Sequence, residues 1–387
     1  MYGVVLAAGS KDATAAVRSA RRLLVARADD LGDNVLGSGL PRALAASTTV
    51  ACGFVGTPAG VGLMDTSGLA YVAAVDCRPS TRSDVARAGH AMRRAVAHFN
   101  PDVVLLPRYG FEREALGLAL VGSRRTVVTW EKQATPKRAR RSWWLSLLPG
   151  PRLSAADAPL HELARLQHFA SFLGLDPSTV SPALSPALLG AWHRPPELAE
   201  RESPIVALGI GAAQARRWWP VERFADLAVH LAGRGFVPVL LGSPDEAPRA
   251  RQLVEGLSER AQVVDLVGRL ALADTARLLR HCALYVGNDS GIGHIAAATT
   301  TATVTISCHP AGAPASHVNA PERYAPAGPR SVVVRPEAPH DPRCASGCVP
   351  VDEPCCILEV PLAAVSEACD ALLAAASSPA VVEEDGR

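Results

Sequence analysis

The sequence lacks a charge excess, a long apolar run and a secretion signal. Lys and Arg number 39 against 37 Asp and Glu, which leaves a net charge of +2. General nucleic-acid binders carry a strong basic excess, so we expect no nucleic-acid partner. No apolar stretch reaches ~18 residues without charge or proline, and the run that begins at Tyr2 is too short for a signal peptide or anchor. These absences predict a soluble, cytoplasmic protein.

The cysteines do not suggest a disulfide framework. There are nine of them, an odd number, in a long chain without a secretion signal. That pattern is typical of reduced thiols in the cytosol.

What is present is enough apolar material for two cores. The chain has 387 residues, of which 48% are hydrophobic and 20% charged. At ~150 residues per domain, two domains are expected.

Apolar runs alternate with helical segments along the chain, which predicts parallel sheets with crossover helices. In the first half we expect strands at 21–28, 49–55, 70–75, 102–106 and 125–129, and helices up to residue 46, at 83–98 and at 159–173. In the second half we expect strands at 205–209, 237–241, 263–266, 283–286 and 303–307, and helices at 221–233, 247–259, 273–281, 293–298 and 362–375.

Proline punctuates the sequence between Pro177 and Pro204, where regular structure becomes sparse. The expected organisation is a leader segment at 1–20, an α/β domain at 21–177, a linker at 178–204, a second α/β domain at 205–376 and a flexible tail at 377–387.

The segment 285–298 (YVGNDSGIGHIAAA) is an apolar strand, a small-residue turn and an alanine-rich helix. A helix N-terminus offers N–H groups and the positive end of a dipole, and glycines let a ligand approach. A diphosphate suits such a site, and the alternative is an ordinary strand–helix turn capped by a side chain. The candidate donor-binding residues are Asp289, Ser290, Gly291, Ile292, Gly293 and His294; a histidine alone is more often a packing residue.

A second strand, small-residue loop and helix lie at 206–224 (VALGIGAAQARRWWPVERF). Gly211 belongs to the loop, and Arg216 and Arg217 precede the helix, where a guanidinium can pair with a phosphate. The alternative is that both arginines are solvated. The glycine spacing and the absence of an acid after the next strand disfavour a dinucleotide-binding redox site.

Together, these segments resemble the ADP-heptose:lipopolysaccharide heptosyltransferases, glycosyltransferase family 9. The similar stretches are RRWWPVERFADLA, GFVPVLLGSPDE and YVGNDSGIGHIAAA, with LLVARADDLGDNVLGSGLPRAL near the N-terminus and the cysteine segment 344–365. Similarity spans roughly 21–370, although 45–200 is similar only in general layout.

The resemblance implies an α/β GT-B architecture, two Rossmann-like domains with parallel sheets facing a cleft, acceptor in the first and nucleotide sugar in the second. It implies an inverting transfer that requires no catalytic metal or other cofactor, with ADP-heptose as donor. Asp33 matches the general base of the family, and the arginine pair falls where the family has a lysine. From chemistry alone a helix cap or loop acid is the favoured interpretation of Asp33, and Asp29 and Asp30 are rivals for the role of base.

Three further groups stay ambiguous. Glu246 can accept hydrogen bonds from a ribose or serve as a first-turn helix acid. A basic cluster beside tryptophans suits a phosphorylated or lipid-linked acceptor, or the inner face of a membrane, and equally a solvated loop; it contains Lys132, Lys137, Arg138, Arg140, Arg141 and Trp143. The third group, Cys344, Cys348, Cys355 and Cys356 with His340, lacks the spacing of ordinary zinc sites, and thiols packing a loop are favoured over a metal.

The sequence thus predicts a transferase that moves a sugar, heptose from ADP-heptose, to a glycan or glycolipid hydroxyl. Two alternatives remain open. One is transfer from another nucleotide sugar in natural-product or surface-glycan biosynthesis, and the other is nucleotide binding without catalysis.

Overall fold

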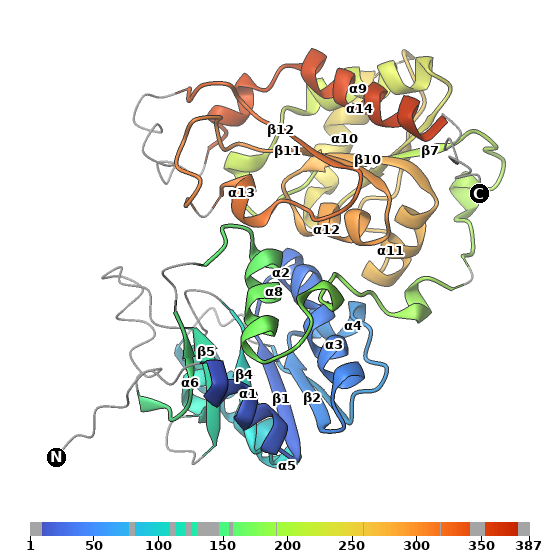
Figure 1. Ribbon diagram of the computed structural model, residues 1–387. Coiled ribbons are helices and arrows are strands. Elements are labelled where there is room, and N and C mark those ends of the chain that lie inside the picture. Colours follow the sequence, from blue (N-terminus) through green and yellow to red (C-terminus); the bar gives the residue numbers. More distant parts are fainter. Residues whose placement is uncertain are drawn as a thin grey trace, which may run out of the picture. The chain divides into compact units, whose positions relative to one another are not determined.

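The computed structural model describes residues 10–76, 82–108, 114–120, 125–130, 147–154, 158–190, 192–257, 259–317, 319–340 and 353–377. The chain divides into two compact units, Met1–Pro186 and Ala187–Arg387 (Figure 1). The division falls inside the predicted linker at 178–204.

The first unit contains a six-stranded parallel sheet in the order β3-β2-β1-β4-β5-β6. Its strands are β1 (Arg22–Arg27), β2 (Ala51–Gly56), β3 (Tyr71–Ala74), β4 (Val103–Leu106), β5 (Thr126–Trp130) and β6 (Arg152–Leu153). Its helices are α1 (Ser10–Ser19), α2 (Leu31–Gly37), α3 (Gly39–Ser47), α4 (Pro58–Leu63), α5 (Arg82–Phe99), α6 (Glu114–Leu120) and α8 (Glu162–Phe172).

Helices cover both faces of this sheet, which explains why β4 and the interior of β1 are apolar. One core contains side chains of α1, α3 and α8, and the other contains side chains of α5 and α6.

The expected leader segment at 1–20 is wrong for its second half. Residues 10–19 form α1, and Ala13 and Val17 are buried in the same core as Leu166 and Phe169 of α8. The four-residue spacing of these two buried side chains is that of a short amphipathic helix, which belongs to the domain.

The second unit repeats the plan, with six parallel strands in the order β12-β11-β10-β7-β8-β9. They are β7 (Ile205–Gly209), β8 (Val237–Leu241), β9 (Val264–Asp265), β10 (Cys282–Asn288), β11 (Ala302–Ile306) and β12 (Ser331–Val334). The helices are α9 (Val221–Gly233), α10 (Ala247–Leu257), α11 (Leu272–Arg280), α12 (Gly291–Ala298), α13 (Pro321–Tyr324) and α14 (Leu362–Ser377).

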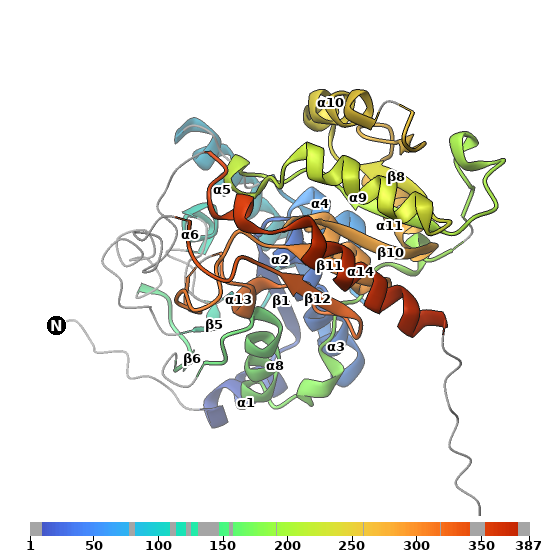
Figure 2. The ribbon, with the colours of Figure 1, turned by 90° about the horizontal axis from the view of Figure 1, so that it is seen from above.

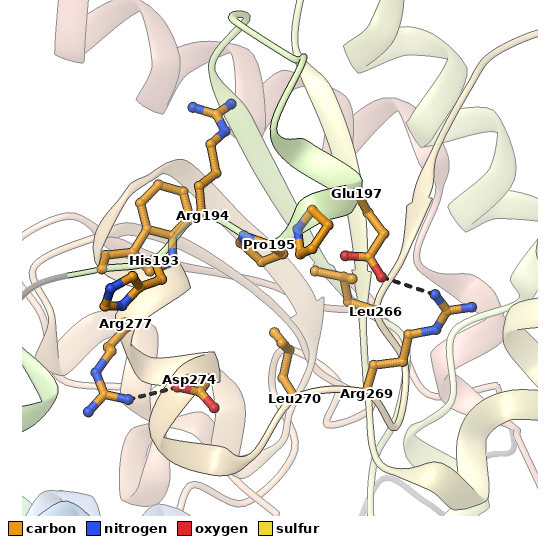
Figure 3. Close-up of a pocket in the computed structure, with 11 residues that line it drawn as sticks. His193, Arg194, Pro195, Glu197, Leu266, Arg269, Leu270, Asp274 and Arg277 are labelled. Carbon is orange, nitrogen blue, oxygen red and sulfur yellow. Dashed lines mark hydrogen bonds and ion pairs between the residues drawn. The ribbon is translucent and has the colours of Figure 1, made fainter.

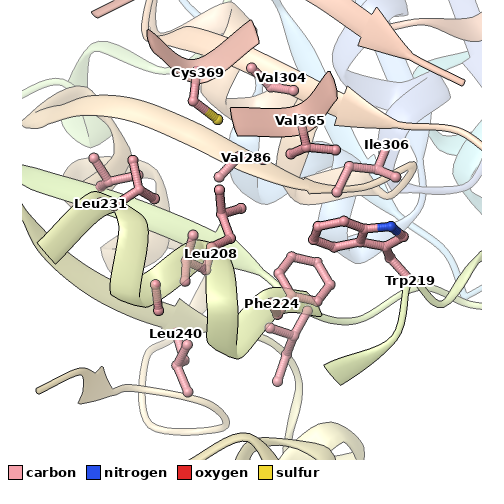
Figure 4. Packing of buried hydrophobic residues seen from close by; sticks show 14 of the residues in the cluster. Leu208, Trp219, Phe224, Leu231, Leu240, Val286, Val304, Ile306, Val365 and Cys369 are labelled. Carbon is pink, nitrogen blue, oxygen red and sulfur yellow. The ribbon is translucent and has the colours of Figure 1, made fainter. Parts of the chain in front are cut away.

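Helices α9 and α14 lie side by side on one face of this sheet, and α11 and α12 lie together on the other (Figures 1 and 2). The core under α9 and α14 is closed by Trp219, which packs edge-on against Phe224 at 5.0 Å between ring centres (Figure 4). The Trp219 indole N–H also donates to the carbonyl of Val360 at 2.9 Å, which ties the start of α9 to the segment before α14.

Candidate functional site

In the first unit the candidate base Asp33 lies in the first turn of α2, directly after β1. Its side chain is 19% exposed. The rival Asp29 is fully buried, and Asp30 is exposed at the N-cap position of α2, where its side chain makes no capping bond. Of the three carboxylates, Asp33 combines partial burial with access to solvent.

Four charged residues from three parts of the unit surround Asp33. Arg27 ends β1 and is buried, its Nε bonded to the Asp29 carboxylate and its Nη2 lying 3.2 Å from Glu162 Oε1 on α8. Arg108, just after β4, lies 2.5 Å from Asp29 Oδ1 and 3.6 Å from Asp33 Oδ2. Gly37 makes room for this arrangement, because a Cβ there would lie 2.4 Å from Arg27 Nη1.

The surroundings of Asp33 raise its pKa from 3.8 to about 7. Burial is the largest cause, followed by the negative charge of Asp29, while Arg108 acts in the opposite direction. Burial also raises the pKa of Glu162. A carboxylate that titrates near neutrality is suited to accept a proton from a hydroxyl.

The second unit places its candidate residues at the carboxyl ends of adjacent parallel strands. Asn288 ends β10 and is buried; its Oδ1 accepts from the N–H of Trp219 at 3.0 Å and its Nδ2 donates to the carbonyl of Ile210 at 2.8 Å. The asparagine therefore fixes the turn before α12 against the loop after β7.

Arg217 contacts this turn and Arg216 does not. Arg217 Nη1 lies 3.3 Å from Asp289 Oδ2, and its Nη2 donates to Asn319 Oδ1 at 2.9 Å. The Arg216 guanidinium bonds to Gln214 Oε1, at 2.8 Å from Nη2. The cation at the start of α12 is therefore Arg217.

The turn itself shows a mixture of exposed and packed residues. Gly291 and Ile292 are half-buried in the first turn of α12, and Ser290 occupies the N-cap position without a side-chain capping bond. Gly293 faces the ring of Tyr285, whose Cε1 lies 3.3 Å from the position a Cβ would take. His294 is buried, at 6% exposure, as a packing residue is.

Glu246 has the structural role that the sequence left open. Its carboxylate accepts from the N–H of Ser243 and so caps the turn before α10. It also lies against Gly211, where a Cβ would come within 2.2 Å of the carboxyl carbon.

The sequence did not indicate a pocket of about 610 Å³ at the carboxyl end of β9 (Figure 3). Leu266 and Leu270 contribute apolar surface, and the ion pairs Arg269–Glu197 and Arg277–Asp274 flank it at 3.2 and 2.7 Å. The backbone bond from Gly268 N to Gly242 O, 3.0 Å long, joins this loop to the end of β8. The other lining residues are Trp192, His193, Arg194, Pro195 and Pro196.

Several sequence candidates lie outside the described residues. These are Lys132, Lys137, Arg138, Arg140, Arg141, Trp143, Cys344 and Cys348. Of the remaining cysteine candidates, Cys356 is buried and Cys355 half-buried, and His340 pairs with Glu359 at 2.6 Å.

The described part of the chain offers neither a metal cluster nor a membrane-spanning helix. No group of three or more His, Cys, Asp or Glu side chains there could hold a metal ion. Within the same residues, no helix has the length and apolarity needed to cross a membrane.

Two parallel sheets in separate units, each covered by helices on both faces, define a pair of Rossmann-like domains of the GT-B class. Residues 159–346 match the model of glycosyltransferase family 9 (heptosyltransferase), which confirms over that range the family that the motifs indicate. Lipooligosaccharide heptosyltransferase 2 of Haemophilus influenzae is 33% identical over 132 residues. That match covers 33% of this chain and only 38% of the relative.

Solved structures show the same fold over most of the chain. The family 9 glycosyl transferase from Veillonella parvula has a TM-score of 0.69 at 16% identity, covering 92% of this chain and 97% of that one. The E. coli heptosyltransferase WaaC with ADP-2-deoxy-2-fluoro heptose has a TM-score of 0.63 at 18% identity, covering 90% and 99%.

Proposed function

We propose that the protein is an inverting glycosyltransferase that moves a sugar from a nucleotide diphosphate to a glycan or glycolipid hydroxyl. The observation that carries the proposal is the ion pair of Arg217 with Asp289 at the N-terminus of α12. A cation and the amide groups of a helix start are the means of stabilising a departing diphosphate without a metal.

In this proposal the bound donor lies along the carboxyl edge of the second sheet. The diphosphate binds at the turn 289–294 between β10 and β11, with Arg217 beside it. The ribose reaches Glu246 and Gly211 at the ends of β8 and β7, and the base enters the pocket at the end of β9. The order of the strands, β11-β10-β7-β8-β9, supports this path.

Asp33 is the proposed general base. As the acceptor oxygen attacks the anomeric carbon, the carboxylate takes the hydroxyl proton and the bond to the diphosphate breaks, which inverts the configuration. Its raised pKa, about 7, supports this role because a stronger base accepts the proton more readily.

ADP-heptose is the proposed donor, in keeping with the family match and with the ADP-2-deoxy-2-fluoro heptose that accompanies WaaC in its solved structure. No cofactor is required in this mechanism. A thermal-shift screen of ADP, UDP and GDP compounds tests the choice of donor, since a ligand at 100 times its Kd stabilises by ~2.7 kcal/mol. UDP- or GDP-sugars giving the largest shift would refute ADP-heptose.

The neighbouring arginines supply a matched pair of variants. Arg217→Gln should weaken nucleotide diphosphate binding by about tenfold or more, because one charge-assisted contact contributes ~1.5–3 kcal/mol. Arg216→Gln, whose side chain bonds to Gln214 and not to the turn before α12, should leave the affinity within about twofold. Isothermal titration calorimetry with ADP measures both, and equal losses in the two variants would contradict the assignment.

A further inference from the structure

We propose that Asp29 and Arg108 are positioning residues that set how readily Asp33 accepts a proton. The inference rests on the proposed function, in which Asp33 removes the proton of the acceptor hydroxyl.

Arg108 is shared unequally between two carboxylates. Its Nη1 lies 2.5 Å from Asp29 Oδ1, within hydrogen-bond distance, whereas its Nη2 lies 3.6 Å from Asp33 Oδ2, beyond it. The guanidinium is therefore bonded to Asp29 and gives Asp33 only a longer-range attraction.

The surroundings of Asp29 favour its bond to the Arg108 guanidinium. Asp29 is fully buried, and its carboxylate also accepts a hydrogen bond from Nε of a second guanidinium, that of Arg27. Two guanidinium groups contact the Asp29 carboxylate and favour its ionised form.

The other charged groups around Asp33 come from known elements. Arg27 belongs to β1, Asp30 precedes α2, and Glu162 and Arg165 belong to α8, which packs against α2. Helix α4 also packs against α2, and its sequence PAGVGL has no ionisable side chain. Asp29 and Arg108 therefore act on Asp33 together, because the Arg108 guanidinium lies between the two carboxylates and is shared by them.

Removing the two charges has opposite consequences. Without the charge of Asp29, Arg108 is released to pair closely with Asp33, and a near like charge is lost, so Asp33 becomes a weaker base. Without Arg108, Asp33 loses its nearest cation and holds its proton to higher pH.

The test is the pH dependence of kcat/KM in the full-length protein with Asp29→Asn and Arg108→Gln. We expect the acid limb to move down by about one pH unit in the first variant and up by about one unit in the second. Well below the midpoint, one unit corresponds to a tenfold change in rate. Arg42→Gln is the control, since Arg42 is an exposed side chain that pairs with Asp65 at 3.5 Å, and its loss should leave the limb in place.

A second measurement does not depend on activity. ¹³C NMR of protein labelled at the aspartate carboxyl carbons follows the titration of Asp33, assigned by the signal that Asp33→Asn removes. Opposite displacements of its midpoint in the two variants support the inference. Unchanged midpoints, or displacements in the same direction, overturn it.

The outcomes separate this inference from the proposed function. Full turnover in Asp33→Asn would end the role of Asp33 as base, while the NMR titration still decides whether Asp29 and Arg108 control its proton. If Asp29→Asn does not fold, Arg108→Gln and Arg108→Lys decide the matter at a partly exposed position. The lysine variant should restore a midpoint near that of the wild type, and equal midpoints for glutamine and lysine would overturn the inference.

Discussion

At the scale of single residues, Asp33 couples stability to pH. Because its pKa is raised from 3.8 to about 7, the folded chain binds a proton between these values that the unfolded chain has released. The raised pKa of Asp33 therefore adds to the free energy of unfolding. This contribution is fully present below pH 3.8 and is lost as pH rises through about 7. Asp33→Asn should therefore raise Tm by a few degrees at about pH 8 and change it little at about pH 3.5.

Asp102 is a carboxylate whose pKa is shifted in the opposite direction, and it can be tested by the same measurement of Tm, made by calorimetry. The backbone N–H groups of Arg21 and Arg22 donate to its carboxylate and lower its pKa. Asp102→Asn should therefore lower Tm at about pH 8. A Tm for Asp33→Asn that stays below the wild-type value at this pH would show that Asp33 carries no burial cost.

The candidate site was predictable where its residues are neighbours in sequence. The turn 289–294 and the arginine pair each belong to one short segment whose residue types are suited to bind phosphate. Arg27, Arg108 and Glu162 were missed, because they meet only through the order of strands and the packing of α8. A charged residue at the end of an otherwise apolar strand was the available signal for Arg27. Sequence also could not choose between Arg216 and Arg217, since the choice depends on side-chain direction.

At the scale of elements, the close packing of the loop after β7 against the turn before α10 yields a prediction. Gly211→Ala places a Cβ within 2.2 Å of the Glu246 carboxyl carbon and must displace that side chain. If Glu246 binds the ribose, ADP affinity should fall by about tenfold, the value of one charge-assisted hydrogen bond.

Gly233, at the end of α9, is the matched control for that substitution. A Cβ there meets nothing within 4 Å, so Gly233→Ala should leave ADP affinity unchanged and keep or slightly raise Tm. Calorimetric titration compares the two variants. An unchanged affinity in Gly211→Ala would limit Glu246 to its capping role.

Elements were predictable where the chain alternates strongly between apolar runs and amphipathic segments. The strands at 205–209 and 237–241 and the helix at 221–233 have the predicted bounds. The edge strand β12 was missed, since its half-exposed SVVV stands between prolines and loops. Helix α4 was missed because glycine and proline dominate it; Thr57, which accepts from the N–H of Gly60, and a proline in the first turn specify it instead.

At the scale of the whole molecule, the division into two units predicts which backbone amides a bound nucleotide protects from hydrogen exchange. The proposed donor contacts all belong to the second unit, at the carboxyl ends of β7, β8, β9 and β10, whereas Asp33 and its charged neighbours belong to the first. Hydrogen exchange of the full chain with saturating ADP should slow the amides of 209–217, 242–246, 266–270 and 289–294.

Protection by ADP should not extend to the α2 region of the first unit, because ADP lacks the sugar and the acceptor. Binding stabilises the unit that holds the ligand, and a unit that makes no contact with it gains protection only through coupling. Arg217→Gln should remove the protection, and Asp33→Asn should retain it. Protection centred on residues 29–37 would place the nucleotide in the wrong unit and refute the proposed donor site, whatever the activity of the enzyme.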